Sequence, residues 1–535
     1  MAERSHKRSR QELSPALPTR DGDTTSLWMA GTDLPQLERL DHDVSVEVCI
    51  VGAGIAGLTT AYLLSREGRS VIVIDDKPPG GGQTARTTAH LSAVLDDGLH
   101  RLEQLHGRTG ARAAVQSHAF AIDQIESICG LEAIDCGFTR LDEYLYTPPE
   151  VPADQINRDL EREAAAARRA GLAVEWVPRA PLGFDTGPCL KFAQQAQFHP
   201  LAYTNGLVRA ITMRGGRVYS QTHADIVRGG DLARIQTGHG PTITSAVVIV
   251  ATNVPVNDLA VVHTKQAPHR TYVITARIPR GSIPLALYSD TLDPYHYVRI
   301  EQGLELDTLI VGGEDHRTGQ DLQPERKWAR LVEWAQQRFP MMGEVQQLWS
   351  GQILEPVDGL GFIGRNPLDA DNVYIATGDS GHGMTHGTIA GILLTDLIQG
   401  RQNPWSELYS PSRRSLRAVT DFMSYNLNVA AQYAEWFQRG DVGAPEAIPL
   451  GQGAVVRRGL RLIATYMDPS GVRHECSAAC PHMGGVVHWN RAEHTWDCPC
   501  HGSRFDPYGR VVEGPAISGL TPIESDEPSR GDPLK

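Results

Sequence analysis

The fold of the N-terminal part of this chain is decided by the stretch Val46-Glu-Val-Cys-Ile-Val51-Gly52-Ala53-Gly54-Ile55-Ala56-Gly57. Its apolar beginning predicts a short buried strand, and residues 58–67, which follow Gly57, have a helical pattern that ends at Gly68. A second apolar run, residues 70–74, ends at the acid Asp75. A strand, a G-x-G-x-x-G turn, a helix and a second strand that ends in an acid together predict a dinucleotide-binding α/β unit.

Each residue type in this turn has a physical reason. Gly52 permits a tight turn, Gly54 lets the backbone approach a pyrophosphate, and Gly57 lets helix and strand pack closely. The start of the helix offers N–H groups and the positive end of its dipole to the phosphates. Asp75 can accept hydrogen bonds from a ribose diol, which disfavours NADP. The predicted dinucleotide contacts are Gly52, Ala53, Gly54, Ile55, Ala56, Gly57, Asp75 and Asp76.

A second glycine-rich turn distinguishes FAD from NAD. It reads Gly80-Gly-Gly82-Gln-Thr84-Ala-Arg86-Thr87-Thr88-Ala89-His90. Residues 46–90 resemble the D-amino-acid oxidase and glycine oxidase superfamily, in which this region wraps the pyrophosphate, ribityl chain and isoalloxazine. The resemblance implies FAD, held here by Gly82, Thr84, Arg86, Thr87, Thr88 and Ala89. A surface loop that opens a helix is the alternative, and covalent attachment of the flavin through His90 is a minor one.

Two later segments resemble further flavin signatures of the same superfamily. The predicted strand 247–250 runs into Ala251-Thr252-Asn253, where Asn253 replaces the usual glycine and its contact stays open. The strand 372–379 ends in Ala-Thr-Gly-Asp, and an apolar helix is expected over 388–397. The resemblance implies that this helix points its positive N-terminus at the flavin N1/C2=O edge, where reduced flavin is anionic. The added FAD contacts are Ala251, Thr252, Gly378, Asp379, Gly383, Met384 and Thr385.

The segments between these signatures are less informative. Residues 100–170 are expected to be mostly helical, with His118 on a helix surface. Residues 271–277 and 295–300 alternate like strands, and the resemblance implies a substrate-domain sheet that roofs the flavin here. The candidate catalytic residues are Tyr272, His296, Tyr297 and Arg299, with Glu314 and His316 as further pocket candidates. The alternative is ordinary strand alternation, with these side chains facing solvent.

The C-terminal part carries a metal-binding pattern. Cys480-Pro-His482 is followed, after fifteen residues, by Cys498-Pro-Cys500-His501. Two thiolates and two imidazoles in the order C-x-H and C-x-x-H predict a Rieske [2Fe-2S] cluster, with the cysteines on one iron and the histidines on the other. A tetrahedral zinc site is the alternative. Strand-like runs at 453–467 and 486–490 predict a small all-β domain, and residues 514–516 stand where Rieske proteins place a third loop over the cluster.

Two departures from the Rieske pattern concern the cluster's surroundings. Respiratory Rieske proteins join their two cluster loops by a disulfide, but here Cys500 would face Gly485. The clamp cannot form, so the loops must be held by packing. Ser503 matches a hydroxyl that hydrogen-bonds a cluster sulfur, whereas Phe505 stands where high-potential members have tyrosine. One hydrogen bond fewer lowers the expected potential within the Rieske range of about −150 to +300 mV.

Composition limits the function classes. The 535 residues carry a formal net charge of −13, which leaves no basic footprint for nucleic acid. No apolar run reaches the length of about 18 residues that a membrane-spanning helix needs, and the first residues have no signal-peptide core. Four of the eight cysteines are scattered and four lie near the predicted cluster, which favours a reducing cytoplasmic location.

The predicted fold class is an α/β, Rossmann-like FAD-binding domain with an α+β substrate domain and a small all-β Rieske domain. We expect an N-terminal tail and lead-in at 1–44, the oxidoreductase at 45–440, a linker at 441–449, the Rieske domain at 450–525 and a tail at 526–535. The FAD-binding segments are 45–100, 245–260 and 345–400, and the substrate-domain segments are about 140–245 and 260–345.

The predicted function is that of an FAD-dependent oxidoreductase that dehydrogenates a C–N bond of an amine or amino acid. The Rieske cluster would pass the electrons singly to an external protein or quinone. One alternative is a reductase that receives electrons through the cluster. Another is a redox sensor or electron carrier without its own substrate, which a formed pocket lined by residues 270–320 would count against.

Overall fold

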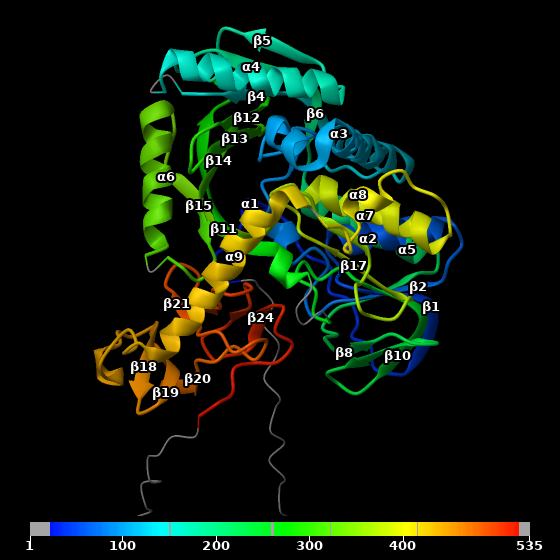
Figure 1. Ribbon diagram of the computed structural model, residues 1–535, viewed down its shortest axis with the longest axis vertical. Helices are drawn as coiled ribbons and strands as arrows, with labels where there is room; N and C mark the ends of the chain where they lie inside the picture. Colours follow the sequence, from blue (N-terminus) through cyan, green and yellow to red (C-terminus); the bar gives the residue numbers. More distant parts are fainter. Residues whose placement is uncertain (1–21, 149–150, 258–261, 322, 415, 524–535) are drawn as a thin grey trace, which may run out of the picture.

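The computed structural model describes residues 22–148, 151–257, 262–321, 323–414 and 416–523 (Figure 1). The first 21 residues of the predicted N-terminal tail and the predicted tail 526–535 lie outside this part of the chain.

The dinucleotide-binding unit is built on one sheet, here called the nucleotide sheet. Its strand order is β16 (Phe362–Arg365), β17 (Val373–Thr377), β10 (Thr242–Val250), β1 (Val44–Val51), β2 (Val71–Ile74) and β7 (Arg217–Tyr219), with the hairpin β8 (Ala224–Arg228) and β9 (Ala233–Thr237) attached to β10. The strands from β17 to β7 pair in parallel, so their carboxyl ends share one edge. The helix α2 (Ile55–Arg66) starts at that edge, directly after β1, as the glycine pattern predicts.

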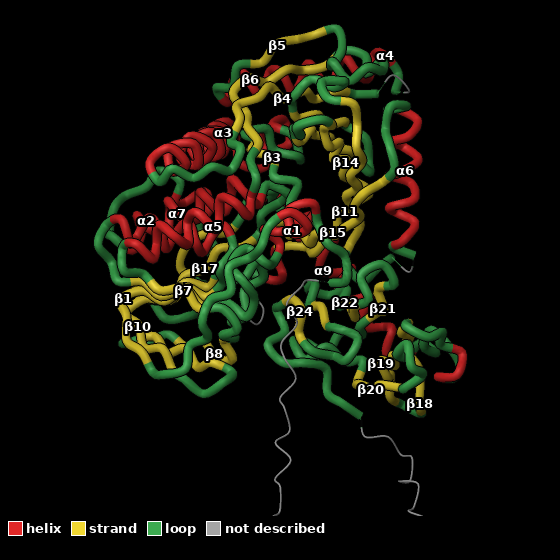
Figure 2. Tube along the Cα trace, turned by 180° about the vertical axis from the view of Figure 1, so that it is seen from behind, coloured by secondary structure: helices red, strands yellow, loops and turns green. Residues whose placement is uncertain are grey.

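Alternation along β1 determines what covers each face of the nucleotide sheet. Val48 and Ile50 pack with α2, α5 (Pro200–Met213) and α7 (Gly383–Ile398), which form the helical layer visible from behind in Figure 2. Cys49 and Val51 pack on the other face, with residues of the β8–β9 hairpin. The helix predicted over 388–397 corresponds to α7, which starts five residues earlier than predicted, at Gly383.

A second sheet, here called the roof sheet, stands above the nucleotide-binding edge (Figure 1). Its order is β15 (Val345–Pro356), β11 (Gln266–Pro279), β14 (Leu306–Arg317), β13 (His296–Glu301), β12 (Leu287–Asp290), β4 (Thr139–Tyr146), β6 (Cys189–Gln197) and β3 (His90–Leu91), with β5 (Val174–Val177) beside β6. The helix α6 (Glu325–Arg338) covers one face through Trp328, Leu331 and Trp334.

Residues 100–170 are mostly helical, as expected, but they also contain one strand that was not predicted. Two helices are present, α3 (Leu99–Leu131) and α4 (Ala153–Ala170), but β4 lies between them. Charged residues interrupt the apolar alternation of β4, so its local pattern is weak. Pairing with β6 and β12 holds it in the roof sheet, because strand formation depends more on neighbours than on intrinsic preference.

The C-terminal domain is all-β, as predicted, and contains two small antiparallel sheets. One has β18 (Gln452–Arg458), β19 (Arg461–Met467) and β20 (Arg473–Ser477), and the other has β21 (His488–Asn490), β22 (Thr495–Asp497), β23 (Arg504–Phe505) and β24 (Val511–Glu513). The predicted linker is tied to this domain, because the Asp441 N–H donates to Val455 O at 2.7 Å. The architecture is the α/β unit, α+β roof and all-β domain expected from the sequence.

Residues 22–44, which belong to the predicted tail and lead-in, pack against the core of the fold. The short helix α1 (Leu27–Gly31) places Trp28 in the core, where its Nε1–H donates to Thr87 O at 2.6 Å. The Ser26 hydroxyl donates to Ala85 O at 2.6 Å. This segment therefore supports the predicted flavin-binding turn from outside.

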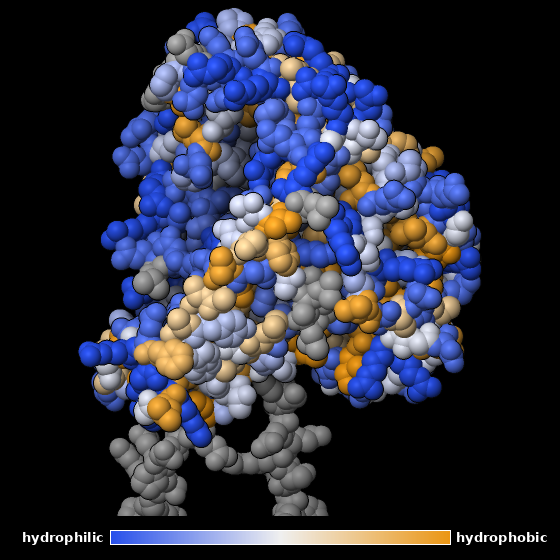
Figure 3. All heavy atoms as spheres, viewed as in Figure 1, coloured by the Kyte–Doolittle hydropathy of each residue, from blue (hydrophilic) through white to orange (hydrophobic). Residues whose placement is uncertain are grey.

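The helix α9 (Val419–Gln432) runs diagonally from the oxidoreductase part to the C-terminal domain (Figure 1). Its inner face carries Tyr425 and Val429, which are buried, whereas Met423 and Leu427 are 58% and 67% exposed. Figure 3 shows apolar residues gathered along this diagonal. In the part of the chain that the structure describes, none of the helices combines the length and the apolar character needed to cross a membrane.

Candidate functional site

A cavity lies where the nucleotide sheet, the roof sheet and the C-terminal domain meet. The predicted FAD contacts that line it are Gly52, Gly54, Ile55, Ala56, Asp75, Asp76, Gly82, Thr84, Arg86, Thr87, Thr88, Ala251, Thr252, Gly378, Asp379, Gly383 and Met384. Segments far apart in the sequence are thus brought to one site, as the three flavin signatures imply. Their roles toward FAD stay predictions.

Ala53, Gly57, Ala89 and Thr385 do not line the cavity, and each has a visible structural role. A Cβ on Gly57 would lie 1.9 Å from Gly52 O, so Gly57 permits the close packing of helix and strand. The Ala53 N–H donates to Asp75 Oδ2 at 2.6 Å. Thr385 hydrogen-bonds His118, and Ala89 O accepts from Arg299 at 3.0 Å.

The acids after β2 form a coupled pair at the nucleotide end of the cavity. Burial and the neighbouring Asp76 raise the pKa of Asp75 to about 7. Burial acts to raise the pKa of Asp76 as well, but the neighbouring Lys77 and His223 hold that pKa below the ordinary value. His223 Nδ1 lies 3.4 Å from Asp76 Oδ2. This end therefore presents one carboxylate that is readily ionised and one that is easily protonated.

Two histidines give a test of whether the cavity suits a polar ligand such as FAD. His90 and His386 both line it, and the Nε2 atom of each is shielded from solvent without a hydrogen-bond partner. His386 is 5% exposed and lies in the first turn of α7. A buried imidazole nitrogen without a partner is costly, so a ligand that contacts these atoms fits the site.

His118 was expected on a helix surface, and this expectation was wrong. The residue is 2% exposed, and its Nδ1 lies 2.8 Å from Thr385 Oγ1. Its ring also contacts that of His382, with 5.6 Å between centroids. Because α3 packs against α7, the residue supports the start of α7 from behind.

Of the four candidate catalytic residues, only Tyr297 lines the cavity. Its hydroxyl lies 2.8 Å from Thr271 Oγ1. Tyr272 packs on Trp328 of α6, and His296 stacks on Trp334 with 4.4 Å between centroids. The expectation that both line the pocket was wrong, because they lie on the α6 face of the roof sheet.

The remaining candidates also lie away from the cavity. Arg299 is fully buried and donates to the carbonyls of Thr88 and Ala89 at 2.8 and 3.0 Å, so it holds the predicted flavin turn from behind. Glu314 pairs with Arg330 of α6 at 2.7 Å. His316 stacks on Tyr272 with 5.6 Å between ring centroids. Their contacts are with protein groups of the roof and of the turn.

Two carboxylates at the roof end of the cavity were not anticipated. Glu143 of β4 accepts a hydrogen bond from Ser92 Oγ, and burial raises its pKa to about 7. Asp96 lies 3.3 Å from His382 Nε2, and although burial opposes it, His382 holds the pKa of Asp96 below the ordinary value. Neither acid belongs to a sequence motif, and β4 was not recognised as a strand, so no signal pointed to them.

The predicted cluster ligands converge at the tip of the C-terminal domain. Cys480 and Cys498 are each 2% exposed, and the rings of His482 and His501 lie 5.0 Å apart. The loops are closed by backbone hydrogen bonds from Cys480 N–H to Gly485 O and from Cys498 N–H to Ser503 O, both 2.8 Å. His501 Nδ1 is buried without a hydrogen-bond partner, which fits a metal ligand.

Gly485 lies next to Cys500, the cysteine whose disulfide partner is missing in this chain. A Cβ on it would be 2.6 Å from Cys500 Sγ and 3.2 Å from Cys498 Sγ. Cys476 is not a substitute partner, because its thiol faces Tyr508 O at 3.6 Å. The third loop is instead held by the Ala516 N–H, which donates to Ser503 Oγ at 3.1 Å.

The histidine side of the cluster site faces the oxidoreductase part. His263, in the short helix His263–Lys265 before β11, lies with its ring 5.0 Å from that of His482 and 5.9 Å from that of His501. Gln352 of β15 lines the cavity, and its side chain donates to Gly502 O at 3.2 Å. One side chain thus separates the cavity from the residue next to His501.

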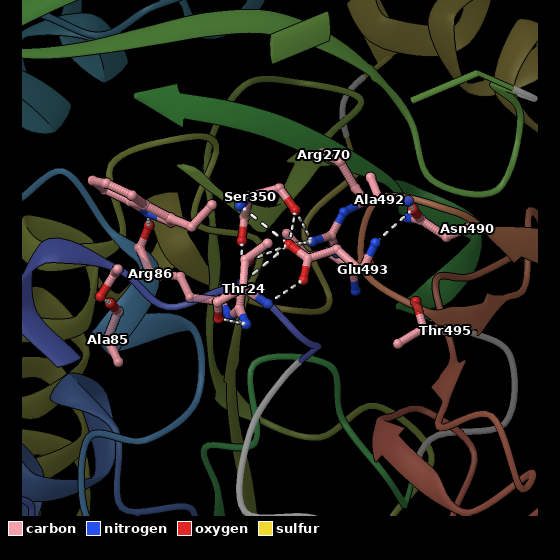
Figure 4. Close-up of polar contacts among 12 residues, drawn as sticks. Thr24, Ala85, Arg86, Arg270, Ser350, Asn490, Ala492, Glu493 and Thr495 are labelled. Carbon is pink, nitrogen blue, oxygen red and sulfur yellow. Dashed lines mark hydrogen bonds and ion pairs between the residues drawn. The ribbon is translucent and has the colours of Figure 1, made fainter. Parts of the chain in front are cut away.

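A buried ion network fixes this arrangement (Figure 4). Glu493, in the turn between β21 and β22, is wholly buried and lies 3.2 Å from Arg86 Nη1 and 3.5 Å from Arg270 Nη2. It also accepts hydrogen bonds from the Thr24 and Ser350 hydroxyls. Although burial opposes it, Arg86, Arg270 and Arg504 lower the pKa of Glu493 to about 2. The carboxylate therefore stays ionised and joins the two parts of the chain.

The C-terminal domain also forms a wall of the cavity. Residues 511–514 and Ala516 line it. Glu513 accepts hydrogen bonds from Gln83 at 3.0 Å and from Asn253 at 3.1 Å. Asn253 has a φ of 65°, a left-handed conformation that Asn tolerates better than most residues. The asparagine in place of the usual glycine thus keeps the turn and adds a contact to the cluster domain.

Comparison with known proteins agrees with this geometry. The family described as FAD dependent oxidoreductase matches residues 47–397, and the Rieske [2Fe-2S] domain family matches residues 438–524. The chain belongs to the FAD dependent oxidoreductase family. This FAD dependent oxidoreductase thus has FAD and a Rieske [2Fe-2S] cluster as its cofactors, which answers the alternatives of NAD and zinc.

Three similar proteins place this FAD dependent oxidoreductase among its relatives. A Bacillus subtilis protein, YhfW, whose name describes a Rieske 2Fe-2S iron-sulfur protein, is 33% identical over 93% of this chain and 97% of its own length. The gamma-glutamylputrescine oxidoreductase of Escherichia coli is 26% identical over 70% of this chain and 89% of its own. The structure of glycine oxidase from Geobacillus kaustophilus covers 69% of this chain and 99% of its own, with a TM-score of 0.59 and 18% identity, which shows the shared fold.

Proposed function

We propose that this FAD dependent oxidoreductase dehydrogenates a C–N bond of an amine or amino acid and delivers the electrons through its Rieske cluster to an external acceptor. Bound FAD supplies the hydride acceptor, and the cluster supplies one-electron transfer. The observation that carries the proposal is the position of Gln352, which lines the cavity and hydrogen-bonds Gly502 beside His501.

The chain's own residues account for binding and orientation. The first turn of α7, with Gly383 and Met384 on the cavity wall, directs the positive end of the helix dipole into the site. Tyr297 and Thr271 form a hydrogen-bonded wall on the roof side. The third cluster loop closes the nucleotide side and helps to exclude water.

The electron-carrier alternative is disfavoured by the formed cavity. Thr271, Ser289, Tyr295 and Tyr297 line it, so residues 270–320 build a wall, as expected for an enzyme with its own substrate. In the reductase alternative, electrons flow in the opposite direction through the same groups, from the cluster to the flavin. An experiment distinguishes the two directions of electron flow.

The test is anaerobic mixing of the oxidised holoenzyme with a panel of amines and amino acids while the flavin absorption is recorded. We expect at least one compound to bleach the flavin in this experiment. If no compound bleaches it and reduced ferredoxin reduces cluster and flavin readily, electrons flow inward and the proposal is wrong.

A further inference from the structure

We propose that the substrate is a diamine: one amino group is oxidised, the second stays protonated, and no carboxylate stands beside the reacting carbon. This inference rests on the proposed amine dehydrogenation and names the substrate class of the same cavity. It comes from the distribution of charge along the cavity wall.

The lysine and arginine side chains among the described lining residues are both at the nucleotide end. They are Lys77, which donates to Val512 O at 2.7 Å, and Arg86, which is engaged by Glu493 and by Ser350 O. At the roof end the described lining residues include neither lysine nor arginine. An α-amino acid would place its carboxylate there without a fixed positive partner, and burying an unpaired charge is costly.

The roof end carries carboxylates instead. Glu143 and Asp96 line the cavity, and Asp315 and Glu355 interact electrostatically with Asp96 from β14 and β15. Asp315 follows Glu314 in the bulge opposite Thr271, and Glu314 points to α6. Asp315 does not itself line the cavity: its carboxylate oxygens are shielded from solvent, and the side chains of Thr271 and Tyr295, which do line it, act to lower its pKa against the effect of burial. The two acids that reach the cavity wall, Glu143 and Asp96, suit a ligand that brings N–H donors and positive charge.

The titratable groups around this end come from several elements. Those that line the cavity are Asp96 before α3, His382 before α7, His90 of β3, Glu143 of β4, and Tyr295 and Tyr297. Asp315 of β14 and Glu355 of β15 lie behind them, with Lys327 acting on Asp315, and with Arg317 and His269 acting on Glu355. Although burial opposes it, Asp96 raises the pKa of His382, so the opposite charges of these two residues offset each other. Burial raises the pKa of Glu143 and Asp315 to about 7 and that of Glu355 to about 8. A bound ammonium group would ionise them, so affinity should increase as the pH rises through this range.

The redox step balances with the flavin as oxidant. The C–H bond beside the neutral amino group breaks, and its electron pair leaves as hydride to the flavin. The nitrogen lone pair forms the C=N bond, and water converts the resulting iminium to an aldehyde and ammonium. The two electrons would then leave the flavin one at a time through the Rieske cluster to the external acceptor, as proposed above.

The test measures binding to the FAD- and cluster-loaded protein by calorimetry and by perturbation of the flavin spectrum. The probes are a diamine whose nitrogen-bearing carbons carry methyl groups in place of hydrogen, and α-aminoisobutyrate, an amino acid without an α-hydrogen. Neither can be oxidised by hydride loss. The variants are Glu143→Gln and Asp96→Asn, both at acids that line the cavity. Asp142→Asn is the matched control, since Asp142 is next to Glu143 on β4 and pairs with Lys191 at 2.9 Å.

We expect the diamine to bind the unaltered protein more tightly than α-aminoisobutyrate, and more tightly at about pH 8 than at about pH 6. At least one of the cavity variants should weaken diamine binding by about tenfold or more, because it loses one hydrogen bond to a charged group. Asp142→Asn should leave the diamine affinity unchanged. Tighter binding of α-aminoisobutyrate, or an unchanged diamine affinity in both cavity variants with FAD retained, would overturn the inference.

The two proposals fail differently. If the methylated diamine binds as expected but no oxidisable diamine bleaches the flavin, the dehydrogenation is wrong and the ligand class stands. If α-amino acids bleach the flavin and diamines do not, the dehydrogenation stands and the diamine inference is wrong.

Discussion

A single glycine decides how the cluster loops are held. A Cβ on Gly485 would lie 3.4 Å from Cys500 Cβ and 2.6 Å from its Sγ. Disulfides have Cβ–Cβ distances of about 3.5–4.5 Å, so the backbone is close to the geometry that a bridge requires. In this chain the loops are held by the hydrogen bonds at Cys480, Cys498 and Ser503 instead.

We therefore expect Gly485→Cys to form a disulfide with Cys500 and to slow thermal loss of the cluster. Mass spectrometry after alkylation without reductant would show both thiols protected, and the cluster EPR signal would persist longer on heating. The matched control is Gly485→Ser, which adds similar bulk but cannot bridge, and which should shed the cluster faster. Alkylation of both cysteines in a protein with an intact cluster would contradict this account.

The residue that replaces tyrosine near the cluster tests the second departure. Phe505 is fully buried in β23, two residues after Ser503. We expect Phe505→Tyr to raise the cluster's reduction potential by some tens of mV, because a hydroxyl would add a hydrogen bond to sulfur. Ser503→Ala should shift it the other way. EPR-monitored redox titration measures the potentials of both variants and of the unaltered protein. Equal potentials for these three proteins would show that hydrogen bonding to sulfur does not set the potential.

Among the elements, the β21–β22 turn connects the cluster domain to the flavin-binding turn through Glu493. Removing this carboxylate leaves Arg86 and Arg270 buried without it. We expect Glu493→Ala to lower the free energy of unfolding by about 3–5 kcal/mol and to weaken FAD retention, since Arg86 lines the cavity. Thermal unfolding and flavin release measure the two effects. Asp23→Asn, at an exposed ion pair with His494 on the same turn, should change neither.

The same carboxylate predicts a pH dependence. Its pKa of about 2 in the folded chain lies below the ordinary value of 4.5, so its ionised form stabilises the fold above about pH 4.5. This contribution, on the order of 3 kcal/mol, should be lost as the pH falls from about 4.5 toward 2. Urea unfolding at several pH values would show it as a steeper acid decline in the unaltered chain than in Glu493→Gln. Parallel declines would show that other groups carry the acid sensitivity.

The elements that carry a local pattern were predictable, and the others were not. The β1–α2–β2 unit and the four cluster ligands follow spacings that the chemistry itself imposes, so their motifs can be recognised without a structure. The strand β4 has a weak pattern and depends on β6 and β12. Which face of a roof strand meets the cavity depends on α6, and this is why Tyr272 and His296 were placed wrongly while Tyr297 was not.

In the whole molecule, the cluster domain forms one wall of the cavity in which we predict that FAD binds. Glu513 and Val512 contact Gln83 and Lys77, and Gln352 contacts Gly502. His263 packs against both histidine rings of the cluster site. These contacts place the predicted cluster site next to the cavity, as the proposed electron transfer within one chain requires.

The most direct test of the proposed route is rapid-freeze EPR during one anaerobic turnover with a substrate that bleaches the flavin. The account predicts that the signal of the reduced Rieske cluster grows as the flavin loses its absorption, at a rate independent of protein concentration. A cluster that stays oxidised while the flavin is fully reduced, or that is reduced only at a rate proportional to protein concentration, would contradict it.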